Sequence, residues 1–478
     1  MVANVPTPPS HRPLALVVGA AFFMEQMDTT IITTSLPQMA RDLGVDPLQM
    51  NLAITAYLIS LVVFIPASGT LADRYGARTV FRTAMALFAL SSIACGLSGS
   101  LGALVAARVL QGASSAMMVP VGRLIMLRSV EKKQLVDAMA WVLMPGMVGP
   151  LLGPPLGGFI TTYSSWHWIF FINVPVAALG VLLAGRYVPH IARQADARLD
   201  IAGLVLSGVA LSAVIHGMDR FSNGLAGGTE TAGWLAAGVL AGVAYARHAR
   251  RMARPSLDFS LLRLQSFGVA FNAGFLVRAG FGALPFLVPL MLQTTLGMNP
   301  LQSGMAMLAG AIAAVFVKAA SVAVLRRAGF RNVLIYNSLI CGASIALCAA
   351  FDASWPIAAI SGVLLVGGMA RALQFNAFGT FAYADVPKDR MSAATSLYST
   401  MQQLAATVGI AVSVWVLQAA TALRGHEQPV RQDYALAFLL IGVLTAAAAW
   451  ICVRLPDRAG AELSGHGSRD ARRATARS

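Results

Sequence analysis

The sequence predicts an all-α integral membrane protein with fourteen membrane-spanning helices, and three observations support this fold class. Of the 478 residues, 57% are hydrophobic and only 12% are charged, about half the charged fraction of an average soluble domain. Apolar runs long enough to cross a hydrocarbon core of about 30 Å as helices recur along the chain. Lysine and arginine gather in alternate connecting segments, which fixes an orientation in the membrane.

The predicted spans fall into blocks of six, two and six. In chain order they lie near residues 14–35, 50–72, 79–99, 102–125, 137–161, 166–188, 200–218, 232–248, 267–292, 302–324, 332–350, 355–380, 393–419 and 433–454. An even number of spans returns both ends of the chain to one side, which the positive charges predict to be cytoplasmic. We therefore expect a multi-pass protein of the cell's inner (cytoplasmic) membrane.

This layout divides the chain into six segments. They are an N-terminal cytoplasmic tail, a six-helix bundle, two linker helices, a cytoplasmic loop, a second six-helix bundle and a disordered cytoplasmic tail. Their predicted bounds are 1–13, 14–198, 199–248, 249–266, 267–455 and 456–478. The two bundles are expected to be pseudo-symmetric halves around a central cavity.

The net charge of +15 follows from this topology, because the basic residues gather in the inner loops. No water-exposed basic domain is predicted, so we expect no nucleic-acid partner. Four cysteines inside apolar spans are predicted to be small core residues, and the seven histidines are scattered. The sequence therefore predicts neither a metal site nor an enzyme.

Span 1 places two carboxylates, Glu25 and Asp28, inside an apolar helix and on roughly one face of it. A charge at the centre of a span costs about 2.5–3.5 kcal/mol on insertion scales, so its presence needs a reason. One explanation is a structural ion pair or a position near the helix end. The other is a protonatable group that faces the central cavity.

A tight, charged turn at residues 69–78 joins spans 2 and 3. Its glycines allow close helix approach and a sharp reversal, and its acid is expected to pair with its arginines. A generic loop of the positive-inside kind is the alternative. The five residues of interest are Gly69, Asp73, Arg74, Gly76 and Arg78. The matching segment of the second half, residues 325–331, keeps the glycine and arginines but lacks the acid.

Span 4 carries Arg108 and Gln111 on one face, followed by small residues that permit close packing. One explanation for Arg108 is a structural role, in which it holds helices together by binding carbonyl groups. Arg123, further along the same helix, is expected to reach the inner interface.

Span 5 repeats glycine at helical spacing and carries prolines beside the glycines, which predicts a stripe free of side chains and a kinked helix. The residues are Gly146, Gly149, Pro150, Gly153, Pro154, Gly157 and Gly158. A generic packing interface explains the glycines but not the Gly-Pro repeats.

In the second half, Arg278, Lys318 and Arg371 lie within spans and are functional candidates because of the cost of burying them. A structural role is the alternative for each. The full set of residues predicted to line the central cavity is Gln111, Arg278, Gln293, Arg371, Gln374 and Asn376.

Four of these patterns resemble motifs of one family. The turn at 69–78 resembles the loop 2–3 signature of the major facilitator superfamily. Residues 27–37 resemble the Leu-Asp-x-Thr-x-x-x-x-Ala-Leu-Pro motif of its fourteen-span drug:proton antiporters, with Met27 and Ser35 in place of Leu and Ala. Residues 108–112 match its Arg-x-x-Gln-Gly signature, and 145–158 resemble its antiporter motif. Residues 166–175 are similar to the start of span 6 in fourteen-span members.

The resemblance implies a major facilitator fold and a proton-coupled exporter of lipophilic, cationic drugs that works by alternating access. Asp28 would exchange the proton, and Glu25, which lies outside the motif, is the second candidate for this role. Arg108 would tune a nearby acid, and the 69–78 turn would hold the halves closed on the cytoplasmic side. Protons, a small-molecule substrate and the lipid bilayer are the implied partners.

No cofactor is expected, and no phosphate-binding Gly-x-x-x-x-Gly-Lys-Ser/Thr loop is present in the sequence. The proton gradient is therefore the expected energy source. Two alternatives remain open: a narrow exporter of one metabolite, siderophore or amino-acid derivative, and, more remotely, a membrane-embedded enzyme. The sequence gives no indication of an adaptor or outer-membrane channel as a partner.

Overall fold

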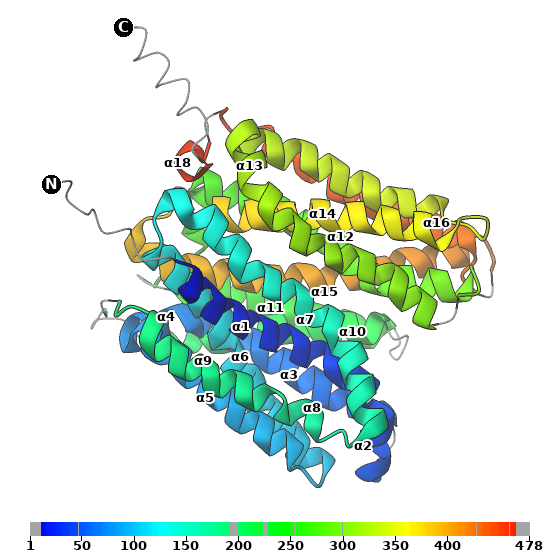
Figure 1. Ribbon diagram of the computed structural model, residues 1–478, viewed down its shortest axis with the longest axis horizontal. Helices are drawn as coiled ribbons and strands as arrows, with labels where there is room; N and C mark the ends of the chain where they lie inside the picture. Colours follow the sequence, from blue (N-terminus) through cyan, green and yellow to red (C-terminus); the bar gives the residue numbers. More distant parts are fainter. Residues whose placement is uncertain are drawn as a thin grey trace, which may run out of the picture.

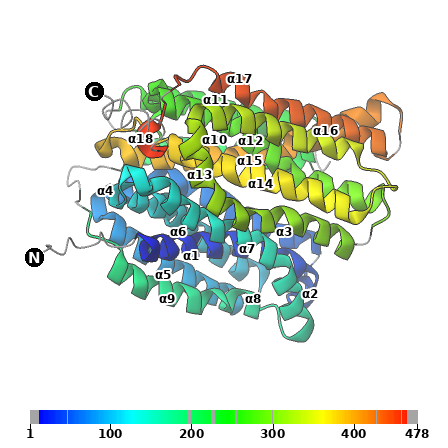
Figure 2. The ribbon, with the colours of Figure 1, turned by 45° about the horizontal axis from the view of Figure 1, so that its top comes forward.

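The computed structural model describes residues 11–45, 47–191, 193, 199–222, 228–252, 255–298, 300–426, 428–457 and 459–464. Within these ranges every regular element is a helix, as predicted. The long helices run side by side in two halves, the first built from the blue to teal part of the chain and the second from the yellow-green to red part (Figures 1 and 2).

The first half follows the predicted order of spans one to six. Its helices are α1 (Arg12–Ile31), α2 (Leu36–Asp42), α3 (Asn51–Phe64), α4 (Ser68–Tyr75), α5 (Ala77–Gly96), α6 (Leu101–Ser129), α7 (Leu135–Tyr163), α8 (Trp168–Phe171) and α9 (Asn173–Tyr187). The helices α3 and α4 form one predicted span, joined by a short 3-10 turn at Ile65–Ala67. The helices α8 and α9 form another.

The second half contains the last six predicted spans. Its helices are α12 (Gln265–Thr294), α13 (Pro300–Leu347), α14 (Ile357–Phe381), α15 (Met391–Leu423), α16 (Arg431–Ala446), α17 (Ala448–Cys452) and α18 (Ala461–Ser464). Two predicted spans fall within α13, and they meet at Gly329, whose φ of 76° and ψ of 162° break the helix. Gly76, between α4 and α5, has a φ of 89°. The reversal predicted from the degenerate repeat thus uses a positive-φ glycine in both halves.

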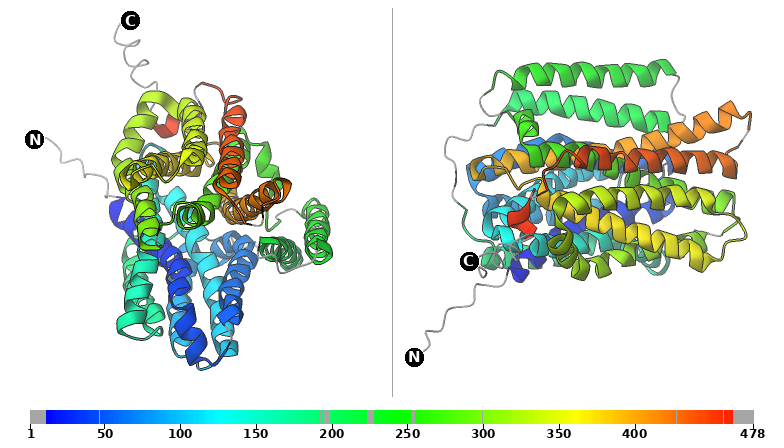
Figure 3. Two further views of the ribbon diagram at one scale, coloured as in Figure 1. Left: turned by 90° about the vertical axis from the view of Figure 1, so that its right-hand side faces the viewer. Right: turned by 90° about the horizontal axis from the view of Figure 1, so that it is seen from above.

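The linker helices α10 (Ile201–Ser222) and α11 (Gly228–Ala249) pack against each other at the edge of the molecule (Figure 3). The helix α10 contacts α3 of the first half and α15 of the second. Buried Asp200 fixes the start of this pair, because it accepts a hydrogen bond from the Gly203 N–H and lies 2.8 Å from His248 Nε2.

Helices occupy all fourteen predicted positions in the described part of the chain. Eleven candidate spans are long and apolar enough to cross a membrane, or up to twelve if the bent helix α7 counts as one span. The helix α11 and the first part of α13 are not among them. The start of α1 and the short helix α18 lie at the same end of the molecule (Figure 1). We call this the predicted cytoplasmic end.

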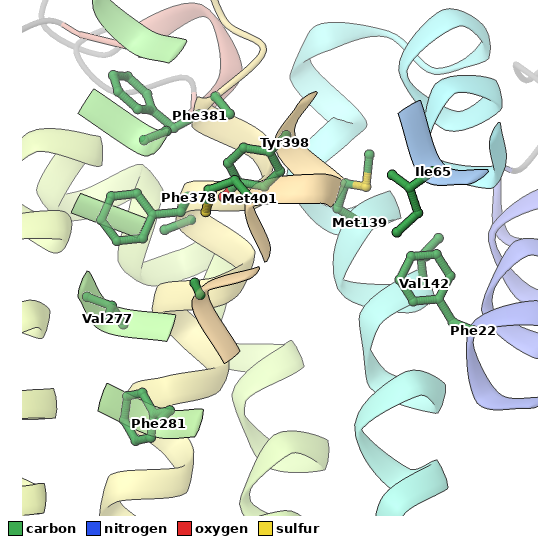
Figure 4. Close-up of a cluster of buried hydrophobic side chains, with 14 of the residues drawn as sticks. Phe22, Ile65, Met139, Val142, Val277, Phe281, Phe378, Phe381, Tyr398 and Met401 are labelled. Carbon is green, nitrogen blue, oxygen red and sulfur yellow. The ribbon is translucent and has the colours of Figure 1, made fainter. Parts of the chain in front are cut away.

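Apolar side chains fill the boundary between the halves. Tyr398 and Met401 of α15 belong to the same buried cluster as Met139 of α7 and Ile65, which precedes α4 (Figure 4). The two halves are therefore held together partly by hydrophobic contact, which needs no fixed geometry and permits sliding.

A close backbone contact between α13 and α16 in the second half can be tested by substitution. A Cβ atom added at Gly342 of α13 would lie 2.5 Å from the Gly442 carbonyl oxygen of α16. We expect Gly342→Val to force these helices apart and to destabilise the protein by about 1–3 kcal/mol, lowering the midpoint of thermal unfolding in detergent. Gly362→Val is the control, because no atom lies within 4 Å of its added Cβ. Equal midpoints for the two variants would contradict this helix crossing.

Candidate functional site

Asp28 lies at the centre of a closed polar network inside the first half. Asp28 is 1% exposed to solvent and Arg108 is 0% exposed. Arg108 Nη1 donates to Asp28 Oδ2 at 2.6 Å, while Gln111 Nε2 and Asn173 Nδ2 each donate to Asp28 Oδ1 at 3.0 Å. These donors match the hydrogen-bond acceptors of a carboxylate, and the guanidinium adds an opposite charge to one of them.

Five helices contribute to this network, which we call the Asp28 network. Arg108 and Gln111 share one face of α6, Asp28 comes from α1 and Asn173 from α9. Gln111 Nε2 also donates to Ser92 Oγ on α5 at 2.7 Å. From α3, the Ala53 carbonyl accepts from Arg108 Nε at 3.3 Å, and the Tyr57 ring lies 4.2 Å from the guanidinium carbon.

Asp28 forms a buried ion pair with Arg108, which is one of the two explanations considered above for a carboxylate in span 1. Removing one partner of a buried pair typically costs about 3–5 kcal/mol, because the other charge is left uncompensated. Arg108 Nη2 already has no hydrogen-bond partner. Loss of the Asp28 charge would therefore leave the Arg108 guanidinium without a carboxylate partner in this network.

Glu25, one turn before Asp28, has a different environment. The residue is 9% exposed, and its Oε2 atom is buried without a hydrogen-bond partner. The charged side chains that act on it are Arg123 and Asp28. Its carboxylate is therefore the less satisfied of the two on α1.

Arg123 does not reach the inner interface as predicted. It is only 3% exposed, and its Nη2 donates to Gln402 Oε1 on α15 at 3.1 Å. Its Nη1 lies 3.5 Å from Ser399 Oγ, also on α15, to which it donates. The prediction was wrong because α15 of the second half passes opposite α6 at this level and supplies the acceptors.

The 69–78 turn contacts the second half at the predicted cytoplasmic end. Ser392 Oγ of α15 donates to Asp73 Oδ1 at 2.6 Å, and Arg128 Nη2 donates to the same oxygen at 3.0 Å. The Gly69 N–H donates to Ser396 Oγ at 2.9 Å. A Cβ atom on Gly69 would lie 2.5 Å from the Ser392 carbonyl oxygen, so the glycine permits this approach. We call these contacts the Asp73 latch.

The arginines of the turn take no part in this latch, contrary to the expected pairing with Asp73. Arg78 donates to the Gly185 carbonyl and lies 2.7 Å, Nη1 to Nδ1, from His190. Arg74 lies over the ring of its neighbour Tyr75 at 5.4 Å. The reversal at Gly76 separates the two groups, because it directs Arg78 toward α9 while Asp73 on α4 faces α15.

The glycine stripe of α7 is a packing face against α1. Added Cβ atoms at Gly146 and Gly149 would lie 3.3 Å from Phe22 Cβ and 2.9 Å from the Phe23 carbonyl oxygen. Gly153 and Gly157 likewise meet residues of α1 or of the 3-10 turn that follows it, and Gly158 meets nothing within 4 Å. The backbone of α7 thus lies directly against the helix that carries Asp28.

The prolines of α7 accompany the expected bend. The segments 132–150 and 155–163 are inclined to each other by 46°. Pro150 is partly exposed, and the side chain of Pro154 lies outside the described residues. A proline removes one helical hydrogen bond and clashes with the preceding turn, which accounts for the bend.

Arg278 and Arg371 bracket one aromatic pair in the second half. The Arg278 guanidinium lies 4.3 Å from the Phe375 ring centroid, and that of Arg371 lies 5.6 Å from the Phe281 ring centroid. The two rings meet edge to face with centroids 6.0 Å apart. Such cation–π contacts contribute about 0.5–2 kcal/mol each, less than the 2.5–3.5 kcal/mol that insertion scales give for a central arginine.

The remaining predicted cavity residues do not gather with these arginines. Gln374 belongs to a network between α13 and α14, where it accepts from Asn337 Nδ2 at 2.6 Å and donates to Ser338 Oγ at 2.8 Å. Gln293 is exposed near the end of α12, and Gln111 belongs to the Asp28 network. Asn376 is buried, with both amide atoms unpartnered. The side chain of Lys318 lies outside the described residues.

Sequence reasoning missed Asn173, Arg128 and Ser392. Asn173 stands in the 166–175 stretch that was singled out without a role, so a signal existed. Arg128 lies in the last turn of α6, in a basic stretch that resembles any inner loop, and a serine at the start of a span carries no signal. These residues became visible only through contacts between distant segments.

Comparison with known proteins agrees with this architecture. The family model described as Major Facilitator Superfamily matches residues 18–410 and 270–476. The chain is 36% identical over 458 residues to "Putative multidrug resistance protein MdtD" of Escherichia coli (strain K12), which covers 94% of this chain and 96% of that protein. The protein with this description from Shigella boydii serotype 18 gives the same values.

Two solved structures share the fold at low sequence identity. One is the human organic anion transporter MFSD10 (TETRAN), with a TM-score of 0.70, 16% identity, and coverage of 93% of this chain and 100% of that chain. The other is the proton:xylose symporter XylE, with a TM-score of 0.64, 15% identity, and coverage of 95% and 97%. These likenesses concern the fold alone.

The Asp28 network predicts strong coupling between its two charges. We expect Asp28→Asn and Arg108→Gln each to destabilise the protein, because each leaves one buried charge unpaired. The double variant should lose less unfolding free energy than the two single variants together, with a coupling free energy of about 3 kcal/mol. A double-mutant cycle of unfolding free energies in detergent measures this value. Additive losses would show that the pair contributes no coupling.

The Asp73 latch predicts a change in accessibility. Losing charge-assisted bonds worth about 1.5 kcal/mol shifts a two-state equilibrium by about tenfold. We therefore expect Asp73→Asn to accelerate maleimide labelling of Met139→Cys, a buried boundary position, about tenfold. The native cysteines of the described part are buried. Arg74→Gln is the control and should leave the rate unchanged; faster labelling there but not in Asp73→Asn would contradict the assignment.

Proposed function

This chain belongs to the major facilitator superfamily, and on that premise we propose that it is a proton-coupled secondary exporter of small lipophilic compounds. It is a multi-pass membrane protein and a transporter by family, not an enzyme. The name of its 36% identical relatives, which refers to multidrug resistance, supports export of several compounds. The motifs at residues 27–37 and 145–158 support antiport.

The observation that carries the proposal is the buried carboxylate of Asp28, held by donors from α6 and α9. We propose that a proton arriving from outside neutralises Asp28 and releases Arg108 to another acceptor. Because Asp28 lies on α1 and its donors lie on α6 and α9, the change of partners alters the packing of α1 against its neighbours. Protonation is thereby converted into a movement of helices.

The helix α7 is the proposed route from this switch to the second half. It packs backbone to backbone on α1 through its glycine stripe, and it also contacts α13 and α14. A shift of α1 would therefore displace α7 and, through it, the boundary between the halves. The Asp73 latch would open when the halves rock apart at the predicted cytoplasmic end, as alternating access requires.

Energy would come from the proton gradient across the inner membrane, without a cofactor. A potential of 100 mV supplies about 2.3 kcal/mol per charge moved, enough for one or two protons to drive substantial accumulation. Both chain ends would lie in the cytoplasm. The resemblance to drug:proton antiporters favours lipophilic cations as substrates, with Glu25 as the carboxylate that a cation would approach.

The proposal predicts gradient-driven transport that depends on Asp28. Purified protein in proteoliposomes should move a fluorescent lipophilic probe such as ethidium, or an anionic counterpart, when a pH gradient is imposed. Asp28→Asn should reduce this flux at least about 100-fold, the usual scale for loss of a proton-transfer group. Asp457→Asn, at an exposed carboxylate, is the matched control. Gradient-driven flux that survives in Asp28→Asn would overturn the assignment.

A further inference from the structure

Positive charge exceeds negative charge among the ionisable side chains that lie within the spans near the boundary of the halves. In the described part of the chain, Asp28 is neutralised by Arg108, which leaves Glu25 as the remaining carboxylate on α1. Against it stand Arg123, Arg278 and Arg371. The ionisable groups that act on Arg278 are Tyr398 and Arg123, and no carboxylate is among them.

Arg278 and Arg371 lie near the middle of α12 and α14, yet both are partly exposed. Neither takes part in an ion pair among the described residues, and Arg371 Nε is buried without a partner. The rings of Phe375 and Phe281 cover one face of each guanidinium and leave the edges, which carry the N–H donors, without an acidic acceptor. A half-buried guanidinium whose N–H donors have no acidic acceptor is suited to bind an anion.

We propose that Arg278 and Arg371 bind the anionic group of a lipophilic organic anion beside the Phe281–Phe375 pair. The proposal rests on the proposed transport function and changes the sign of the substrate charge expected from the antiporter resemblance. A carboxylate or sulfonate accepts two parallel hydrogen bonds from a guanidinium, and an aromatic body fits the adjoining rings. The bound anion also offsets part of this excess positive charge.

The sign of the charge has a consequence for coupling. Inward movement of one proton in exchange for one monovalent anion moves two positive charge equivalents inward. The same exchange with a monovalent cation is electroneutral. At a fixed pH gradient, a membrane potential that is negative inside the cell should therefore accelerate export of an anion and leave export of a cation unchanged.

The test compares two probes of the same shape and opposite charge, 1-naphthoate and 1-naphthylmethylammonium. Their dissociation constants are measured by calorimetry on the full-length purified protein in detergent. We expect naphthoate to bind at least about tenfold more tightly than the ammonium probe. Arg278→Gln and Arg371→Gln should each weaken naphthoate binding by about tenfold or more and leave ammonium binding no weaker.

Two further variants secure the interpretation. Arg278→Lys keeps the charge but loses the planar fork, so it should retain part of the naphthoate affinity; it also serves if the glutamine variant fails to fold, as judged by size-exclusion chromatography. Arg263→Gln, at an exposed position before α12, is the control for loss of one positive charge. It should leave both dissociation constants unchanged.

Failure of the site and failure of the transport function give different results. Three results would overturn the anion site: the ammonium probe binds more tightly, neither probe binds, or the arginine variants leave naphthoate binding unchanged. In each case Asp28-dependent flux of ethidium could persist. Arginine-dependent naphthoate binding supports the site even if no gradient-driven flux is found, and that absence would count against the proposed transport function alone.

Discussion

The ion pair between Asp28 and Arg108 is the constraint around which the first half is organised. Two opposite charges with essentially no exposure are stable in an apolar bundle only when they pair with each other and hydrogen bonds satisfy most of their remaining polar atoms. This requirement accounts for the convergence of Gln111 and Asn173 on the same carboxylate and for the Tyr57 ring on the guanidinium. It also makes the protonation state of Asp28 a property of several helices at once.

The glycine stripe connects this electrostatic constraint with packing. A helix that carries a buried charge cannot also be held loosely, because small displacements change the pair's geometry. Close contact of α7 with α1 at Gly149 and Gly153 fixes α1 and leaves no side chains to absorb its movement. By contrast, the halves meet through apolar side chains and a few polar contacts at Asp73 and Arg123, a boundary that can open without breaking either bundle.

Much of the fold could be predicted from the sequence, because membrane spans depend on local hydropathy and on punctuation by glycine and charge. The reversals at Gly76 and Gly329 were both recognisable, although the second lacks the acid.

The partners of charged side chains were harder to predict from the sequence. Arg108 lies 80 positions from Asp28 in the sequence, and only the family resemblance suggested that it tunes a nearby acid. The predictions for Arg123 and for the partner of Asp73 failed because each binds α15, whose position opposite α4 and α6 is a tertiary property. In the second half, the free-energy cost of a charge inside a span identified Arg278 and Arg371 as candidates, but it could not reveal the aromatic pair between them.

The most direct test of the account is a count of protons released when a transported compound binds to the purified protein in weakly buffered detergent solution. An antiporter holds proton and substrate in turn, so binding of the substrate to the protonated protein must release a proton, which a pH-sensitive dye detects. The account predicts release from the intact protein and none from Asp28→Asn at saturating ligand. Release of the same number of protons by both proteins would contradict it.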